Sequence, residues 1–353
     1  MNPYISTIFT LLLIHRAYSR SSLTPPAILS ATLTALIHAT HPTALPFTLL
    51  ITFYLLGTTA TKVKKAEKEK LTVSSGGGHG EHEGRGVIQV LANSAAASIL
   101  CLVDLAVRKG WFELGGLVEE VLGRGSTSGR GWFGGETGCV GDLLVVGVVA
   151  NYAATTADTL SSELGILSKS KPRLILNPWK ICPPGTNGAV SGMGLGAAVV
   201  GATFIGAVSS YWFNPTTTTT TPAVSVMGFI LFTTFIGLSG SLLDSILGAV
   251  FQHSVIDIRT NRIVENPHGG TVLIVPGETT FHPHLHHKEA AEVQKVGGEG
   301  ARGEVDKKDD VGGSRKVVHG RLGWLDNNGV NVSMAVGMSL VGMVAWWALV
   351  EAH

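Results

Sequence analysis

The chain has 353 residues, of which 45% are hydrophobic and 14% are charged, and its mean hydropathy is +0.31. Soluble domains carry about 25% charged residues, so the composition excludes an ordinary soluble domain and indicates a membrane protein. A formal net charge of +1 gives no support for a nucleic-acid partner. The three cysteines lie far apart without CxxC spacing, which supports neither a disulfide framework nor a structural zinc site.

Apolar windows along the chain predict helices that cross a membrane. In chain order they cover residues 3–18, 24–40, 43–61, 87–107, 140–157, 188–213, 222–251 and 330–350. A spanning helix needs about 20 residues, so the first two windows are short and the other six are long enough. The prediction is an all-α fold: a polytopic integral membrane helix bundle of about 6–8 transmembrane helices, forming a single domain over residues 1–353.

The loops between the windows predict the orientation. With eight spans, the basic loop 62–86 lies on the same side as loops 158–187 and 252–329, whereas loop 108–139 balances its basic residues with acidic ones. Because basic loops stay in the cytosol, this side is expected to be cytosolic and both termini to face the other way. The expected location is the endoplasmic reticulum or another endomembrane.

Two inserts are expected to be nonessential. Residues 215–222 form a threonine-rich loop. Residues 265–320 are rich in Gly, His and charged residues, and they are predicted to be a disordered cytosolic insert. A histidine tract within this insert, at residues 282–287, is interpreted as adventitious rather than metal-binding.

Polar elements lie inside or beside five of the predicted spans. They are Asn93, residues 158–163, residues 183–188, Asp244 and residues 326–328. Carboxylates and amides in hydrocarbon are costly, so they usually mark a functional site. The expected topology places all five elements at the cytosolic end of the bundle.

The acidic residues among them suit a metal ion. Asp158 and Glu163 are five residues apart, which on a continuous helix turns them about 140° away from each other. A bend after Asp158 would bring them together, and with Asp244 they would supply the oxygen ligands that Mg²⁺ prefers. The alternatives are that Asp158 caps a following helix and that Asp244 makes a hydrogen bond between packed helices.

The turn at residues 183–188 suits an anion. Gly185, Thr186, Asn187 and Gly188 lead toward an apolar window, and the N–H groups at a helix N-terminus bind phosphate. Lys180 would add positive charge. The alternative is an ordinary Pro-Gly turn between helices.

Asp326, Asn327 and Asn328 precede the last window, and Asn93 lies just inside the fourth. These side chains are candidates for binding phosphate or ribose, with helix capping as the alternative for Asp326. The chain has no GxxxxGK[ST] motif, which excludes a P-loop by pattern.

Five short motifs resemble those of the integral membrane family called transmembrane protein 19, or domain of unknown function 92. They are RGVIQVLAN (85–93), ADTLSSELG (157–165), PPGTNG (183–188), DSILG (244–248) and LDNNG (325–329). The family includes a plant phytyl-phosphate kinase, and the motif order is similar to that of CTP-dependent dolichol and phytol kinases. Residues 186–188 differ from the Glu-Gly-Ser usual in those kinases.

The resemblance implies a CTP-dependent, Mg²⁺-assisted kinase that converts a prenyl or phytyl monophosphate to its diphosphate at the membrane. Asp158, Glu163 and Asp244 would then hold Mg²⁺, residues 185–188 would bind the nucleotide phosphates, and Asn93 with residues 326–328 would orient phosphate or ribose. The alternatives are a multi-pass transporter or lipid-handling protein without kinase activity, and a structural protein with degenerate motifs.

Overall fold

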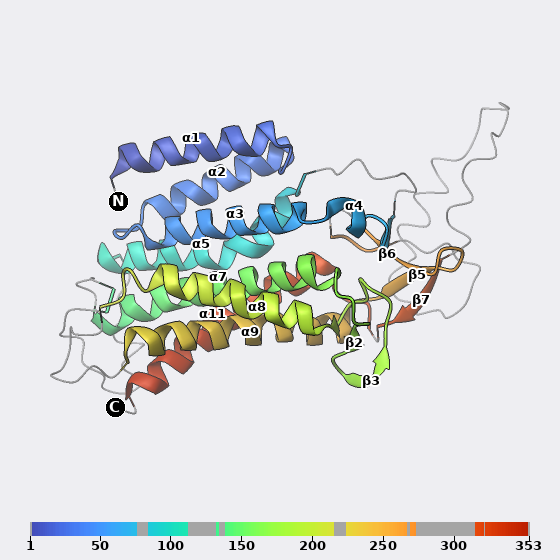
Figure 1. Cartoon of the computed structure of the whole chain (residues 1–353). Coiled ribbons are helices and arrows are strands. Elements are labelled where there is room, and N and C mark those ends of the chain that lie inside the picture. Colours follow the sequence, from blue (N-terminus) through green and yellow to red (C-terminus); the bar gives the residue numbers. More distant parts are fainter. Residues whose placement is uncertain are drawn as a thin grey trace.

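The computed structural model describes residues 2–75, 84–111, 132–133, 138–214, 224–266, 269–272, 315–320 and 322–351. Within these ranges, eight helices of 15 residues or more lie alongside one another (Figure 1). They are α1 (Pro3–Ser19), α2 (Pro25–Ala39), α3 (Leu45–Lys62), α5 (Val87–Arg108), α7 (Gly138–Gly165), α8 (Gly192–Ser209), α9 (Val226–Phe251) and α11 (Asn327–Glu351).

The eight helices coincide with the eight apolar windows, so the predicted helical membrane bundle is confirmed. Five of them, α5, α7, α8, α9 and α11, are long and apolar enough to cross a membrane, and α2 is a shorter apolar helix. Capping side chains mark the start of two of the eight helices: Asn2 accepts the N–H of Tyr4 at α1, and Ser191 accepts that of Gly194 at α8.

Helix α7 is the centre of the bundle. Its apolar window is entirely buried, and it packs against α3, α5, α8, α9 and α11. Small residues permit this packing: a Cβ atom at Gly237 of α9 would lie 2.8 Å from the carbonyl oxygen of Ala153. Helices α1 and α2 lie at one edge of the bundle, where α2 packs against α5 (Figure 1).

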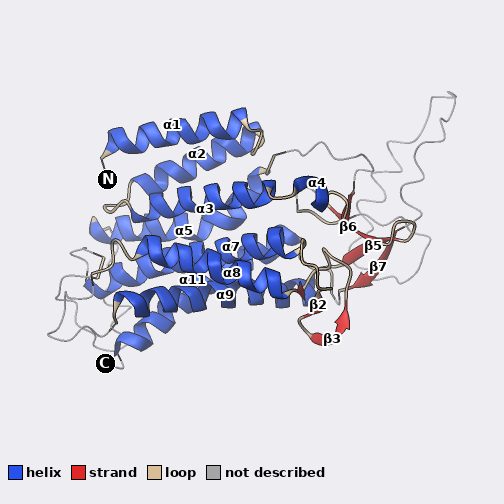
Figure 2. Cartoon of the chain, viewed as in Figure 1, coloured by secondary structure: helices blue, strands red, loops and turns tan. Residues whose placement is uncertain are grey.

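Two small sheets cover one end of the bundle (Figure 2). The four-stranded sheet has the order β1-β6-β5-β7, with β1 and β6 parallel and the other pairs antiparallel. The three-stranded sheet has the order β3-β2-β4 and is antiparallel. Their bounds are β1 (Thr72–Ser74), β2 (Arg173–Leu174), β3 (Asn177–Ile181), β4 (Ala189–Val190), β5 (Ser254–Asp257), β6 (Arg262–Glu265) and β7 (Arg315–His319).

These strands come from segments that the sequence identified as loops. The basic loop 62–86 contains the short helix α4 (Lys65–Lys68) and β1, and β1 pairs with β6 from the segment after α9. The predicted insert 265–320 begins at the last residue of β6 and ends after β7, while its residues 273–314, with the histidine tract, lie outside the described residues. The threonine-rich loop 215–222 also lies outside them.

Helix α7 is longer than its apolar window and continues to Gly165. Asp158 therefore lies inside a regular helix, and it neither leaves the fifth span nor caps a further helix. The bend that was considered after Asp158 is absent, because the main chain of residues 158–165 stays helical.

Candidate functional site

A pair of carboxylates lies between α7 and α9, near the end of the bundle that carries the sheets. Asp158 of α7 and Asp244 of α9 are both half-buried and interact electrostatically. Asp244 Oδ1 is buried, and no hydrogen bond reaches it from the described residues. Two ionised carboxylates that interact in a medium of low polarity repel each other, so the pair favours a bound cation or a shared proton.

Glu163 lies on a different face of α7, toward α3 and α4. Thr61 Oγ1 donates to its Oε1 at 2.8 Å, and Lys68 Nζ donates to its Oε2 at 2.7 Å. The carboxylate of Glu163 is thus already compensated by a cation. The structure brings Asp158 and Asp244 together and places Glu163 apart from them, because a regular helix turns residues five apart by about 140°.

A second cation belongs to the Glu163 cluster. Arg85, which directly precedes α5, donates from Nη2 to Thr61 Oγ1 at 3.1 Å and interacts electrostatically with Glu163. Burial lowers the pKa of Arg85, and the negative charge of Glu163 acts in the opposite direction. Arginine nevertheless stays protonated, so two cations, Arg85 and Lys68, surround one paired carboxylate.

The turn at residues 183–188 packs onto the end of α9 and the start of β5. Gly185 and Gly188 have φ angles of +84° and +74°, which favour glycine. A Cβ atom at Gly188 would lie 2.6 Å from the carbonyl oxygen of Ser245, one residue after Asp244. The backbone N–H of Asn187 donates to Ser254 Oγ at 3.0 Å, and its side-chain amide donates to the His253 carbonyl at 3.1 Å.

The turn does not lead directly into a helix. Strand β4 follows it, and α8 begins only at Gly192, where Ser191 is the capping residue. Thr186 is buried and donates its hydroxyl to the Pro183 carbonyl at 2.8 Å. The expected phosphate site at a helix N-terminus is thus not formed by residues 185–188, and Lys180 lies exposed on β3.

The other candidate residues have structural partners. Asp326 Oδ1 accepts the Gly329 N–H at 2.8 Å and so caps α11, which was the alternative reading of this residue. Asn327 is exposed and Asn328 is buried beside Gly269. Asn93 donates to the Gln89 carbonyl within α5, and its own carbonyl accepts from the side chain of Asn151 on α7.

Sequence reasoning missed Thr61, Lys68, Arg85 and Glu265. Lys68 was counted only as a loop charge, and Arg85 as a loop charge and as the first residue of the motif at 85–93, although an acid such as Glu163 beside a membrane span requires a cation nearby. Glu265 was assigned to the insert, yet its carboxyl lies close to Gly185, where a Cβ atom would be 2.9 Å from Glu265 Oε1. Burial and the charge of Glu163 raise the pKa of Glu265 to about 7.

The acidic pair fits a magnesium ion bound together with phosphate. Within the described part of the chain, no group of three or more His, Cys, Asp or Glu is arranged to hold a metal ion. Mg²⁺, however, is commonly held by one or two carboxylates plus the phosphates of a substrate. Asp158 and Asp244 match this pattern, and the buried oxygen of Asp244 is available to a ligand.

Comparison with known proteins places these features in a family. The chain is 32% identical to Protein PGR of Arabidopsis thaliana over 277 residues, which cover 77% of this chain and 86% of that protein. It is 27% identical to Protein VTE6, chloroplastic, of Arabidopsis thaliana over 207 residues, covering 58% of this chain and 49% of that protein.

An archaeal relative is similar over a shorter stretch. An uncharacterized membrane protein of Methanocaldococcus jannaschii is 38% identical over 112 residues, covering 32% of this chain and 42% of that protein. No solved structure matches the chain. The model of the family described as Integral membrane protein DUF92 matches residues 8–339, and the chain therefore belongs to this family.

Proposed function

We propose that the protein is a membrane phosphotransferase that converts an isoprenoid monophosphate to its diphosphate. The observation that carries the proposal is the pair Asp158 and Asp244, two carboxylates that interact inside a membrane bundle, with Asp244 Oδ1 buried and without a hydrogen bond from the described residues. Such a pair is costly in hydrocarbon and is retained where it binds a ligand. Resemblance to a family that includes a phytyl-phosphate kinase supports the isoprenoid substrate.

In the proposed reaction, an oxygen of the lipid monophosphate forms a bond to the γ-phosphorus of a nucleoside triphosphate. The bond from that phosphorus to the bridging oxygen breaks, and the nucleoside diphosphate leaves with the electron pair. The donor implied by the resemblance is CTP. Because the attacking oxygen belongs to a phosphate, the step depends on positioning and charge stabilisation more than on a base.

The residues of the chain have distinct roles in this proposal. Asp158 and Asp244 would hold Mg²⁺, which when bound neutralises charge on the phosphates. Arg85 and Lys68 would stabilise the negative charge of the lipid phosphate, and Glu163 would hold both cations in position. The turn at residues 183–188 would fix the end of α9 and with it the position of Asp244.

The test is a phosphotransfer assay on the full-length protein in lipid nanodiscs. Phytyl or geranylgeranyl monophosphate, Mg²⁺ and CTP or ATP labelled in the γ position are supplied, and labelled lipid diphosphate is measured. Asp158→Asn and Asp244→Asn are each expected to lower the rate by about a hundredfold or more. Glu67→Gln, which removes an exposed carboxylate of α4 paired with Lys64, is the control and is expected to be fully active.

Failure to form diphosphate with either nucleotide would refute the proposal, as would full activity of both Asn variants. If the wild-type protein binds the lipid phosphate but never transfers phosphate to it, the lipid-handling alternative gains support.

A further inference from the structure

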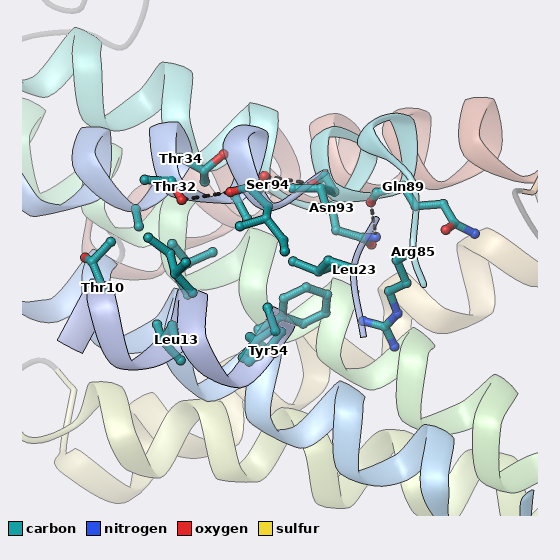
Figure 3. Close-up of a pocket in the computed structure, with 18 residues that line it drawn as sticks. Thr10, Leu13, Leu23, Thr32, Thr34, Tyr54, Arg85, Gln89, Asn93 and Ser94 are labelled. Atoms are coloured by element: carbon teal, nitrogen blue, oxygen red, sulfur yellow. Dashed lines mark hydrogen bonds between the residues drawn. The ribbon is translucent and has the colours of Figure 1, made fainter. Parts of the chain in front are cut away.

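A half-open groove runs between α1, α2, α3 and α5 (Figure 3). The space between its walls is about 740 Å³, and part of this space is open to the surroundings. Most of its wall is apolar, including Leu13, Ala31, Leu50 and Phe53. Along α2 the wall extends from Ile28 to Ala35, a length of about 10 Å at the rise of an α-helix.

The polar groups of the wall are distributed unevenly. Thr32, Thr34 and Ser94 each donate their hydroxyl to a carbonyl of their own helix, so these residues offer the groove little hydrogen-bonding capacity. Arg85, Gln89 and Asn93 lie together at one end, whereas Thr10 and Leu13 lie at the other (Figure 3). The groove therefore has an apolar length and a cationic end.

The cationic end of the groove lies beside α7. A Cβ atom at Gly57 of α3 would lie 3.2 Å from Arg85 Nη1 and 3.5 Å from Thr159 Cγ2. The absence of a side chain at Gly57 thus lets the guanidinium of Arg85 and the side chain of Thr159 both approach α3 at this point. A phosphate bound to Arg85 would lie at the end of the groove next to α7, the helix that also carries Asp158.

We infer that the groove binds the hydrocarbon chain of a lipid monophosphate, with the phosphate against Arg85 and the chain extending toward Thr10. The apolar wall suits a hydrocarbon chain, and the charge of Arg85, which lies near Glu163 and Lys68, complements the phosphate. The placement of the phosphate beside Asp158 rests on the proposed function, whereas binding of the lipid does not.

The inference is tested by binding without nucleotide. Full-length protein in nanodiscs is labelled with a photoactivatable geranylgeranyl monophosphate, and the labelled residues are mapped by mass spectrometry. Labels are expected on α1 and α2. Unlabelled geranylgeranyl monophosphate is expected to compete, inorganic phosphate to have no effect, and geranylgeraniol, which lacks the charge, to compete about tenfold more weakly.

Two variants separate the groove from the head-group site. Ala31→Phe fills the groove and Arg85→Gln removes the charge, and each is expected to lower labelling by about tenfold. The matched control is Leu33→Phe, since Leu33 is on α2, is 54% exposed and lies outside the groove. Thermal melting checks that all three variants are folded, and Arg85→Lys is expected to restore part of the labelling.

Equal labelling of Ala31→Phe and wild type, or labels that map away from α1 and α2, would overturn the inference. If phosphotransfer occurs while Ala31→Phe leaves binding unchanged, the proposed function stands and the groove assignment fails. If labelling follows the variants but no diphosphate forms, the groove assignment stands and the proposed function fails.

Discussion

The acidic side chains at the two ends of the bundle have different interaction partners. At the end away from the sheets, Asp104 Oδ2 of α5 accepts a hydrogen bond from Arg108 Nε at 2.6 Å and lies 3.0 Å from His41 Nε2. Asp142 of α7 accepts the backbone N–H groups of Trp132 and Phe133 at 2.6 and 3.2 Å. Asp104 Oδ1 and Asp244 Oδ1 are both buried without a hydrogen bond from the described residues, so the ends differ in the charge of the partner. At the sheet end, the electrostatic partner of Asp158 is the second carboxylate, Asp244.

The difference separates structural acids from candidate functional ones. Asp104 and Asp142 are compensated by protein groups, so their charge holds a helix or a turn in place. The pair at the sheet end is not compensated in this way, and the protein tolerates the cost in its interior. Glu163 belongs to the structural acids, because Lys68 and Thr61 bind it, although it lies on the same helix as Asp158.

The largest expected effect is a separation of activity from stability at the acidic pair. Asp158→Asn is expected to lower phosphotransfer by about a hundredfold while leaving the melting temperature unchanged or slightly higher, because it removes repulsion between two carboxylates. The melt and the assay are made on the same detergent-purified sample. A marked fall in melting temperature would place Asp158 among the structural acids.

Asp104→Asn is expected to lower stability and to leave phosphotransfer activity unchanged. The substitution leaves His41 and Arg108 beside a neutral partner. The expected loss in the free energy of unfolding is about 3 kcal/mol, the low end of the range for breaking a buried pair. The low end applies because the Arg108 side chain is 16% exposed. Reversible unfolding in mixed micelles measures this loss. Below its melting temperature the variant is expected to keep its activity, and a hundredfold loss in the folded protein would contradict the comparison.

The ion pair of Lys68 and Glu163 is expected to have an intermediate energy. The two side chains are 13% and 25% exposed, so the coupling should lie near the upper limit for surface pairs, at about 1 kcal/mol. A double-mutant cycle with Lys68→Met and Glu163→Gln measures it by unfolding. Additive effects of the two substitutions would show that the pair contributes nothing to stability.

The smallest effect is expected from Glu265. Burial, and secondly the charge of Glu163, raise its carboxyl pKa from 4.5 to about 7, so the folded protein binds a proton that the unfolded chain has released. Stability is therefore expected to fall as pH rises from about 4.5 to about 7 and to level off above that. Glu265 as a whole is an exposed residue, so water weakens this effect.

Melting temperatures of wild type and Glu265→Gln across this pH range provide the measurement. The melting temperature of the variant is expected to depend less steeply on pH than that of the wild type. An equally steep dependence would assign the pH effect to other groups.

The sequence by itself determined the helices and the end at which the polar motifs meet. Long apolar stretches have one stable form in a membrane, because a helix satisfies every backbone hydrogen bond internally, and the eight windows became the eight helices. Segments 158–165 and 183–188 flank one loop and therefore lie at one end of the bundle. The two crossings of α8 and α9 then return the chain to the same end at residues 244–251. The order of these motifs along the chain was enough to group them.

Only the tertiary structure decided which acids meet. The sequence showed Asp158, Glu163 and Asp244 as one set, but α7 continues through residue 165, and its rotation directs Asp158 toward α9 and Glu163 toward Thr61. Glu163 is bound by Lys68 and interacts with Arg85, and both come from the loop 62–86, far from Glu163 in the chain. The groove is formed by four helices. Spacing along a chain cannot specify such contacts, because they depend on how each helix is rotated against its neighbours.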